Sequence, residues 1–587
     1  MSAPLTENAR HVLEARYLKK DLRGKLVERP EEMFARVAQN VASAEARYHG
    51  GPDQREVERQ CFEAMVSLDF LPNSPCLMNA GRRLQQLAAC FVLDVEDSID
   101  GIFGTLKDAA QIHQSGGGTG FSFSKLRPAG SYIATSGGAA SGPVSFIRVF
   151  NQATEAINQG GFRRGANMAV LRVDHPDVME FIRSKNEEGS LVNFNISVGV
   201  TDRFMEALRR DEPFDVIDPQ TGRTARTLPA RQVFDAIVES AWRNGEPGLV
   251  FLDVINAVPP GGRVSNPTPH LGRIEATNPC GEAPLLPYES CVLGSINLSH
   301  MLTGEPPSCQ VAWEKLRRLT HMGVRFLDDV ITVSRHPLPQ VAEITERNRK
   351  IGLGVMGFAD MLIRMGVAYD EPAAVSTGEQ VMRFIAEEAD RASEQLAVER
   401  GPFANFPQSI LASRPRPLRN AIRTAIAPTG TISIIAGCSG GIEPIFAVAF
   451  ERRVLSTVLR EVHPDLAPFC RREGLELPDA LLQRIISTGC VRPMTEMPPL
   501  VRRLFVTSRE VPPLQHVAVQ AAFQRHTDNA VSKTINLPAD ATQDDVREIY
   551  LRAYEMGCKG ITVYRDTSRK SQVLAVECCN LGDVGLN

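Results

Sequence analysis

The sequence lacks any long apolar run and any excess of charge of one sign. Its 587 residues include 65 Lys and Arg against 69 Asp and Glu, which gives a formal net charge of −4. A protein that binds DNA through a broad basic face needs a clear cationic excess, so we expect no nucleic-acid partner of that kind. The sequence has no stretch of 18 apolar residues and no signal-peptide core at its polar N-terminus, so we expect no membrane contact and a cytoplasmic location.

Cysteine is also sparse. The chain has 12 cysteines, and they form neither a Cys-x-x-Cys pair nor a Cys/His cluster at zinc spacing. This cysteine content is too low for a disulfide scaffold. Because no zinc-binding spacing is present, we also expect no protein-held metal site. Most of these cysteines are expected to be small buried side chains, which leaves the question of which few have a chemical role.

Short apolar segments alternate with helical patterns along most of the chain. The predicted strands are 90–93, 121–123, 169–173, 195–200 and 431–435, and the clearest predicted helices are 143–159 and 378–399. This alternation predicts an α/β fold with a large, mainly parallel sheet or barrel. We divide the chain into a short helical N-terminal segment (1–50), a main α/β domain (51–575) and a C-terminal tail (576–587).

The most informative motif is Asn278-Pro279-Cys280-Gly281-Glu282. In an extended segment the first, third and fifth residues point to one side, so Asn278, Cys280 and Glu282 would converge. An amide, a thiol and a carboxylate on one loop suit radical or acid–base chemistry on a polar substrate. A turn with incidental polar residues explains the same pattern. Cys90 and Cys291 are further candidates, although nothing in their spacing shows that they meet.

Three other stretches are rich in glycine, hydroxyl groups or arginine. In 428–433 (PTGTIS), hydroxyls and a glycine follow an apolar run, which indicates an anion nest for a phosphorylated ligand or a capped turn. The glycines of 115–121 (SGGGTGF) permit close backbone approach by a ligand. In 160–167 two arginines stand among glycines, which fits a cationic loop that responds to a nucleotide, or a solvated turn.

Taken together, these motifs resemble the ribonucleotide reductase large-subunit family, most closely its adenosylcobalamin-dependent class II members. The resemblance covers almost the whole chain. It rests on LPNSPCLMNAG (71–81), VEDSIDGIF (95–103), SGGGTGFSFSKLRP (115–128), GGFRRGANMAVLRVDHPDVMEFI (160–182), NPCGE (278–282) and GGIEPIF (440–446). It implies a ten-stranded α/β barrel with a central finger loop, and an enzyme that reduces ribonucleotides to 2′-deoxyribonucleotides for DNA synthesis.

The resemblance also implies roles for single residues. Cys280 would carry a thiyl radical and abstract the ribose 3′ hydrogen, with Glu282 as general base on the 3′ hydroxyl and Asn278 bound to the substrate hydroxyls. Cys90 and Cys291 would be the reducing pair that closes to a disulfide. The implied substrate contacts are Ser74, Ala89, Gly118, Pro428, Thr429, Gly430, Thr431 and Ile432.

Regulation by a deoxyribonucleotide or ATP effector is implied in the same way. The effector site maps to Asp97, Ser98, Ile99 and Arg127, with 160–167 as the loop that passes the signal to the active site. The family commonly places this site at a dimer interface, so a homodimer is a possible arrangement. The N-terminal cone domain that senses ATP in some members is expected to be absent.

The radical source is predicted from what the C-terminal region contains. Class I members use a tyrosine pair and a second, metal-bearing subunit, whereas the matching segment 560–565 has only Tyr564. We find no glycyl-radical motif, which leaves adenosylcobalamin, with no cobalamin contact assigned. A class I-type subunit that needs a metal-radical partner and a non-catalytic nucleotide-binding regulator remain as alternatives.

Two properties stay open from the sequence. Family members usually end in a tail with two spaced cysteines that re-reduce the active-site disulfide, and a thioredoxin-like protein is the usual reductant. This chain has the adjacent Cys578 and Cys579, and adjacent cysteines form strained disulfides. Whether the substrate is a diphosphate or a triphosphate is not predicted.

Overall fold

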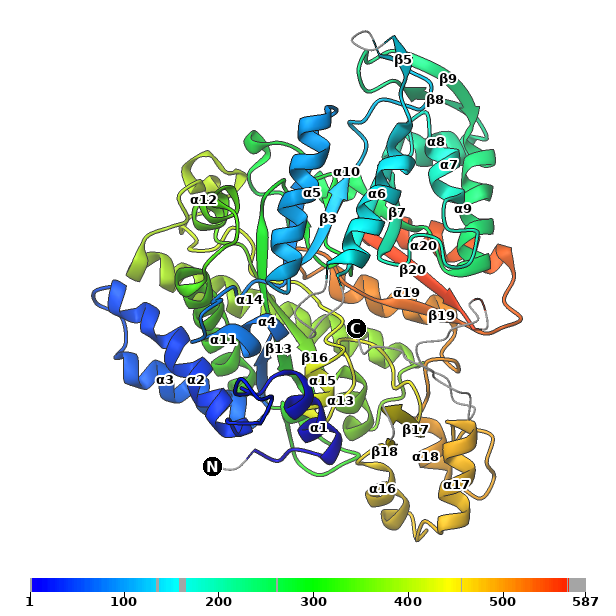
Figure 1. The fold of residues 1–587 in the computed structure, drawn as a ribbon. Helices are drawn as coiled ribbons and strands as arrows, with labels where there is room; N and C mark the ends of the chain where they lie inside the picture. The colour runs from blue at the N-terminus through cyan, green and yellow to red at the C-terminus, as the bar shows by residue number, and fades with distance from the viewer. Residues whose placement is uncertain are drawn as a thin grey trace.

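A computed structural model describes residues 3–133, 137–157, 165–259, 262–454, 457–566 and 568, with the side chains of 452–459 not described. A single ten-stranded sheet dominates these residues (Figure 1). Its order is β1 (Phe70–Pro72), β13 (Ser290–Asn297), β2 (Cys90–Asp94), β3 (Gly118–Ser122), β6 (Asn167–Arg172), β7 (Phe194–Val200), β10 (Gly248–Phe251), β20 (Gly560–Arg565) and β19 (Thr534–Leu537), with β16 (Ile351–Met356) paired to β13. Within the described ranges, no helix is both long and apolar enough to cross a membrane.

The sheet combines three groups of parallel strands. Strands β2, β3, β6, β7 and β10 are parallel, as are β13 with β16 and β19 with β20. The groups meet in antiparallel pairs, β13 with β2 and β10 with β20. The predicted α/β class is confirmed, and the sheet is mixed because the chain returns at β13 and β20 in the opposite direction.

Backbone bridges close the sheet into a barrel. Leu353 of β16 pairs with Thr424, and Ile426 pairs with Val531 just before β19. A side chain at Gly354 would place its Cβ 2.3 Å from the carbonyl oxygen of Ala425. Glycine is therefore required where this connecting segment passes β16.

Helices cover the outer side of the barrel. The longer ones are α5 (Ile99–Gln114), α6 (Gly142–Ala156), α9 (Ala230–Asn244), α11 (Trp313–Val333), α14 (Pro372–Arg400), α19 (Pro513–Gln524) and α20 (Gln543–Glu555). They bury an extensive apolar core against the strands, while a smaller apolar cluster that contains Cys90 and Cys291 fills the inner side. The predicted helices 143–159 and 378–399 correspond to α6 and α14.

The remaining elements connect or flank the barrel. They are α4 (Ser74–Asn79), α7 (Val178–Arg183), α8 (Asp202–Arg210), α10 (Leu252–Asn256), α12 (Pro339–Asn348), α13 (Phe358–Met365), α16 (Leu466–Arg472), α17 (Asp479–Thr488), α18 (Pro499–Leu504), and the strand pairs β4 (Tyr132–Ile133) with β5 (Gly138–Ala139), β8 (Pro213–Ile217) with β9 (Thr224–Pro229), β14 (Leu302–Thr303) with β15 (Gln310–Val311), and β17 (Ala449–Val454) with β18 (Thr457–Val462).

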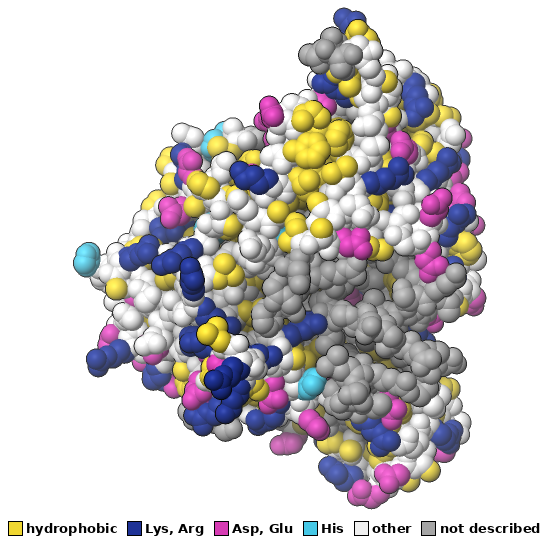
Figure 2. Space-filling view, in the orientation of Figure 1, with side chains coloured by type: hydrophobic (Ala, Val, Ile, Leu, Met, Phe, Trp, Pro, Cys, Tyr) yellow, Lys and Arg dark blue, Asp and Glu magenta, His cyan; other side chains and the backbone are white. Residues whose placement is uncertain are grey.

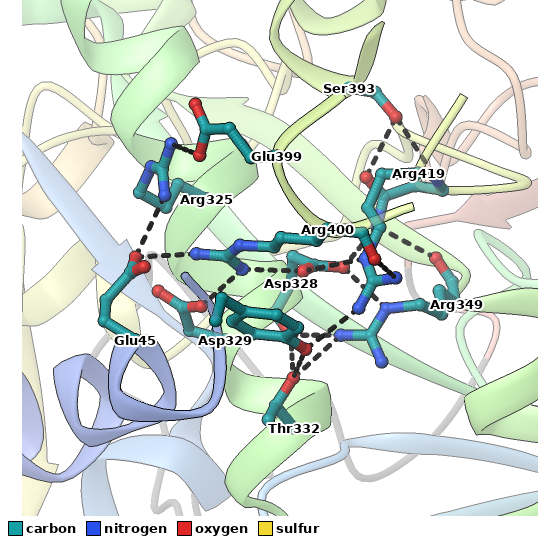
Figure 3. Close-up of polar contacts among 12 residues, drawn as sticks. Glu45, Arg325, Asp328, Asp329, Thr332, Arg349, Ser393, Glu399, Arg400 and Arg419 are labelled. Carbon is teal, nitrogen blue, oxygen red and sulfur yellow. Dashed lines mark hydrogen bonds and ion pairs between the residues drawn. The ribbon is translucent and has the colours of Figure 1, made fainter. Parts of the chain in front are cut away.

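The N-terminal segment (1–50) is helical, with α1 (Glu7–Arg16) and α2 (Pro30–Ala42), and another helix, α3 (Gln54–Val66), follows directly after it. A buried ion network ties the turn after α2 to the barrel helices (Figure 3). Glu45 accepts from Arg325 at 3.0 Å and from Arg400 at 2.6 Å, and Arg400 also binds Asp328 at 2.8 Å. Breaking such a buried pair is strongly destabilising, because it leaves one charge without a partner. The network therefore holds the N-terminal helices against α11 and α14.

The strand predicted at 431–435 is wrong. These residues form a short helix, α15 (Ile432–Ala436), which ends at Gly437 in the left-handed conformation. Isoleucine and threonine favour strands in general, but this preference depends on the neighbouring structure. Here Thr429 turns the chain with φ of 55°, and a glycine C-cap stops it after little more than one turn.

Candidate active site

A short hairpin forms the finger loop. Strands β11 (Ala276–Thr277) and β12 (Pro284–Leu285) pair antiparallel, and residues 278–283 form the tip. The amide N–H of Gly281 donates to the carbonyl oxygen of Asn278 at 3.1 Å, so residues 278–281 are a hydrogen-bonded β-turn. The predicted extended geometry is therefore wrong at Cys280, which occupies the turn and is exposed, whereas Asn278 and Glu282 are buried.

Two glycines of β3 make room for this hairpin. A Cβ at Gly120 would lie 1.9 Å from the carbonyl oxygen of Thr277, and one at Gly118 would lie 3.0 Å from the ring of Pro279. We predicted that the glycine-rich stretch admits a ligand. The structure shows that the finger hairpin comes closest to these two glycines, through the backbone of Thr277 at Gly120 and through the ring of Pro279 at Gly118.

Asn278 and Glu282 converge on Cys90. The side-chain amide of Asn278 donates to the sulfur of Cys90 at 3.0 Å, and the thiol of Cys90 donates to Glu282 Oε1 at 3.7 Å. The amide and the carboxylate that we predicted to share a side thus meet at a cysteine from β2. This arrangement places an acceptor for a proton and a hydrogen-donating thiol within a few ångströms.

Cys90 and Cys291 are direct partners across the antiparallel β2–β13 pair. Such partners have Cα atoms about 4.5–5.5 Å apart, which lies within the range of a disulfide. Burial, with the Glu282 carboxylate nearby, raises the pKa of the Cys291 thiol well above its usual value. This thiol therefore stays protonated at neutral pH and can supply a hydrogen atom.

A cavity of about 1270 Å³ lies on one side of the finger. Cys280 lines it together with Asn195 of β7 and Tyr564 of β20. Asn278, Glu282, Cys90 and Cys291 do not line this cavity and are almost fully buried. The finger tip thus presents one thiol to a large space and keeps the other polar groups inside the barrel.

The predicted substrate residues lie in three places. Pro428 and Gly430 line the large cavity, and the Thr429 hydroxyl accepts from the Gly441 N–H at 2.7 Å, which orders the 428–432 loop. Ala89 and Gly118 adjoin Cys90, since Gly118 pairs with Cys90 and donates its N–H to Ala89 at 2.9 Å. The Ser74 hydroxyl lies 2.7 Å from that of Tyr17.

The four predicted effector residues come together at the surface. Arg127 binds the Asp97 carboxylate at 2.7 Å, and Ser98 caps the start of α5 by accepting from the Gly101 N–H at 2.9 Å. Ile99 is 65% exposed. Residues 160–164 of the predicted signalling loop 160–167, and Cys578 and Cys579, lie outside the described residues.

One contact of the finger was not predicted. The side-chain amide of Asn195 donates to the carbonyl oxygen of Pro279 at 2.9 Å, across a sequence separation of 84 residues. No local pattern reveals such a pairing, because β7 and the finger meet only when the barrel closes.

The sequence matches two family descriptions, "Ribonucleotide reductase, barrel domain" over residues 88–416 and 413–564, and "Ribonucleotide reductase, all-alpha domain" over residues 3–85. The chain belongs to the ribonucleotide reductase family. A "Vitamin B12-dependent ribonucleoside-diphosphate reductase" of Mycobacterium tuberculosis is 50% identical over 96% of this chain and 80% of its own length. A protein of the same name from Thermoplasma acidophilum is 46% identical over 97% of this chain and 80% of its own length.

The reductase fold is also found among solved structures. The Actinobacillus ureae class Id ribonucleotide reductase alpha subunit superposes with a TM-score of 0.77 at 23% identity, covering 96% of this chain and 97% of that one. This similarity confirms the predicted barrel. Across the described part of this reductase, no group of three or more His, Cys, Asp or Glu side chains is placed to hold a metal ion.

Proposed function

We propose that this reductase converts ribonucleotides to 2′-deoxyribonucleotides by thiyl-radical chemistry that depends on adenosylcobalamin. The observation that carries the proposal is the position of Cys280, exposed at the finger tip to the large cavity, with Cys90, Cys291 and Glu282 grouped inside the barrel. A non-catalytic nucleotide-binding regulator would not need three cysteines and a carboxylate in this arrangement. The relatives named as vitamin B12-dependent diphosphate reductases support the cofactor and favour a diphosphate substrate.

The cavity beside Cys280 fits a large cofactor. Pockets for drug-sized ligands measure about 300–1,000 Å³, and this cavity of about 1270 Å³ exceeds that range. Glycines at 245, 248, 430, 437, 440 and 560 line its wall, where a broad ring system can approach the backbone. When bound, adenosylcobalamin supplies the one-electron oxidant for the thiol of Cys280.

The chain's own groups then account for the reduction. The Cys280 thiyl takes the 3′ hydrogen of the ribose while Glu282 accepts the proton of the 3′ hydroxyl. Cys90 and Cys291 together supply two hydrogen atoms, the 2′ oxygen leaves as water, and the two sulfurs close to a disulfide. At the end the Cys280 thiol returns this hydrogen to the 3′ carbon, which completes the product and regenerates the thiyl. The balance is one ribonucleotide and two thiols to one deoxyribonucleotide, one disulfide and one water.

Effector binding and dimer formation are part of the same proposal. A deoxyribonucleotide or ATP would bind beside Asp97, Ser98, Ile99 and Arg127, at the start of α5. Apolar side chains gather over α5 and α6 (Figure 2), where Ile99, Phe103 and Val149 are exposed. A second copy of this chain would cover that patch, as exposed apolar patches commonly mark protein interfaces.

Re-reduction of the disulfide would use a thioredoxin-like protein through Cys578 and Cys579. Deleting residues 576–587 should spare turnover driven by a small dithiol and impair only thioredoxin-driven turnover. An equal loss of both would contradict a role for the tail.

The decisive test of the cofactor is turnover by the pure protein with adenosylcobalamin, an effector nucleotide and dithiothreitol alone. Deoxyribonucleotide formation supports the proposal. A strict need for a second protein would support the class I-type alternative, and absence of turnover under every condition would support the regulator.

A further inference from the structure

The tip of the finger depends on a contact from outside the hairpin. Strands β11 and β12 contribute only two residues each, Ala276 paired with Leu285 and Thr277 with Pro284. Because Pro284 has no N–H, this ladder is weak. Asn278 and Ala283 add two bonds beyond it, from the Asn278 N–H to the Ala283 carbonyl oxygen at 3.2 Å and from the Ala283 N–H to Asn278 Oδ1 at 2.9 Å. Pro279 and Cys280 lie beyond these bonds in a very short hairpin, so a thiol that must react in one direction needs further support.

The support comes from two neighbouring strands. On one side the ring of Pro279 lies against Gly118 of β3, where a Cβ would be only 3.0 Å from the ring. On the other side the amide of Asn195, from β7, donates to the Pro279 carbonyl oxygen at 2.9 Å. Pro279 is thus clamped between two parallel strands of the barrel, one residue before Cys280.

The oxygen that Asn195 binds belongs to the central peptide of the turn. In a β-turn over 278–281 with proline at the second position, type I and type II differ by a flip of this peptide between residues 279 and 280. Type II would force Cys280 to positive φ, which is unfavourable for any residue but glycine. Cys280 is absent from the non-glycine residues of positive φ in the described chain, so the turn has the type I geometry.

We propose that Asn195 is a positioning residue for Cys280, holding the central peptide of the finger turn so that the thiol faces the cavity. The bond from Asn195 can form only while the Pro279 carbonyl points toward β7, and a flipped peptide would turn that oxygen away. The inference rests on the proposed function, because the direction of the Cys280 thiol matters only if this thiol carries the radical. Asn195 itself lines the same cavity as Cys280, so the clamp lies at the place where the radical would start.

The test compares three variants. Asn195→Asp keeps the shape of the side chain but replaces the donor with an oxygen that repels the Pro279 carbonyl, and Asn195→Ala removes the donor without adding charge. Asn244→Asp is the control, because Asn244 also donates its amide to a backbone carbonyl, that of Lys185 at 2.9 Å, next to residues 245 and 246 of the same cavity wall. Each protein is assayed with adenosylcobalamin and dithiothreitol, and each apoprotein by amide hydrogen exchange and thermal unfolding.

For Asn195→Asp we expect kcat to fall about 10- to 100-fold, with a smaller fall for Asn195→Ala, because a small misplacement of a reacting group has effects of this size. The KM for the ribonucleotide should stay within about twofold, since the lost contact acts on the turn. Because Asn195 lines the proposed cofactor cavity, kcat is compared at saturating adenosylcobalamin, so that weaker cofactor binding does not account for the loss. In the apoprotein the peptide over 276–285 should exchange faster than in wild type or in Asn244→Asp, at an unchanged unfolding temperature.

Wild-type kcat in both Asn195 variants, or unchanged exchange over 276–285, would overturn the inference. So would an equal loss in Asn244→Asp. If the wild type itself shows no cobalamin-dependent turnover, the proposed function fails, while the exchange experiment on the apoprotein still decides whether Asn195 holds the finger turn.

Discussion

The side-chain amide of Asn278 lies 3.0 Å from the sulfur of Cys90, although the two residues are 188 positions apart in the chain. This bond joins the finger to the strand that carries one of the two adjacent thiols. Because Cys90 also donates to Glu282 at 3.7 Å, the finger contacts Cys90 through two side chains at once. The finger and the proposed reducing pair therefore form one unit, and changes to either should affect catalysis more than stability.

Replacing either thiol of the pair should stop multiple turnover. Cys90→Ser and Cys291→Ser each remove one of the two sulfurs that must form the disulfide, and serine occupies nearly the same volume. We expect no sustained deoxyribonucleotide formation with dithiothreitol in either variant, measured as product per enzyme over time. Cys470→Ser, at a buried cysteine of α16, is the control and should keep its rate. Many turnovers in both single variants would show that the pair is misassigned.

Glu282→Gln should lower kcat strongly. A positioned general base contributes about 10²–10⁴ in rate, and glutamine preserves the volume and the acceptor for the Cys90 thiol but cannot take a proton. The matched control is Glu275→Gln, just before the finger, where the carboxylate lies 3.4 Å from Arg172 and not at Cys90. A Glu282→Gln enzyme that retains more than about a tenth of the wild-type kcat would contradict the assignment of Glu282 as base.

Gly120→Ala should displace the finger. Its Cβ would lie 1.9 Å from the Thr277 carbonyl oxygen, a backbone atom that cannot swing aside. We expect a loss of about 1–3 kcal/mol in the free energy of unfolding from overpacking, together with a large loss of kcat. In Gly104→Ala, on α5, the new Cβ meets nothing within 4 Å, so the helix should gain up to about 1 kcal/mol. Equal stability of the two variants would refute the close approach.

Much of the barrel could be predicted from local pattern, because buried strands and amphipathic helices have distinct periodicities. The predicted strands 90–93, 169–173 and 195–200 coincide with β2, β6 and β7. The candidate residues on the finger were found because they are adjacent in sequence. The turn at Cys280 and the Asn195 contact could not be predicted, since each depends on long-range closure of the barrel. The pairing of Cys90 with Cys291 was expected only from the family resemblance, because nothing in their spacing indicates it. The strand predicted at 431–435 is wrong for the same reason, because the neighbouring structure overrides the strand preference of these residues.

The free energy of unfolding should decrease as the pH falls, because protonation of the buried His113 is unfavourable in the folded protein. Burial lowers the pKa of His113 to about 4 from an ordinary value of 6.5, and its Nε2 lies 2.8 Å from the Thr119 hydroxyl. Between these two pH values the unfolded chain binds more protons than the folded one, so stability rises with pH across this window and is lost as the pH falls toward 4.

Through His113 alone, the free energy of unfolding should be about 3 kcal/mol higher above pH 6.5 than below pH 4. His113→Gln keeps a polar group beside Thr119 but cannot titrate, so urea unfolding between pH 4.5 and 7 should show a shallower pH dependence than in wild type. An identical slope in both proteins would show that His113 is already neutralised in another way.

The most direct test of the central claim is the turnover of Cys280→Ser with adenosylcobalamin, an effector nucleotide and dithiothreitol, measured beside the wild type as deoxyribonucleotide formed. A serine hydroxyl does not form the corresponding radical, so we predict no product from the variant, while its unfolding temperature and its binding of adenosylcobalamin match the wild type. Full turnover by Cys280→Ser would contradict the account.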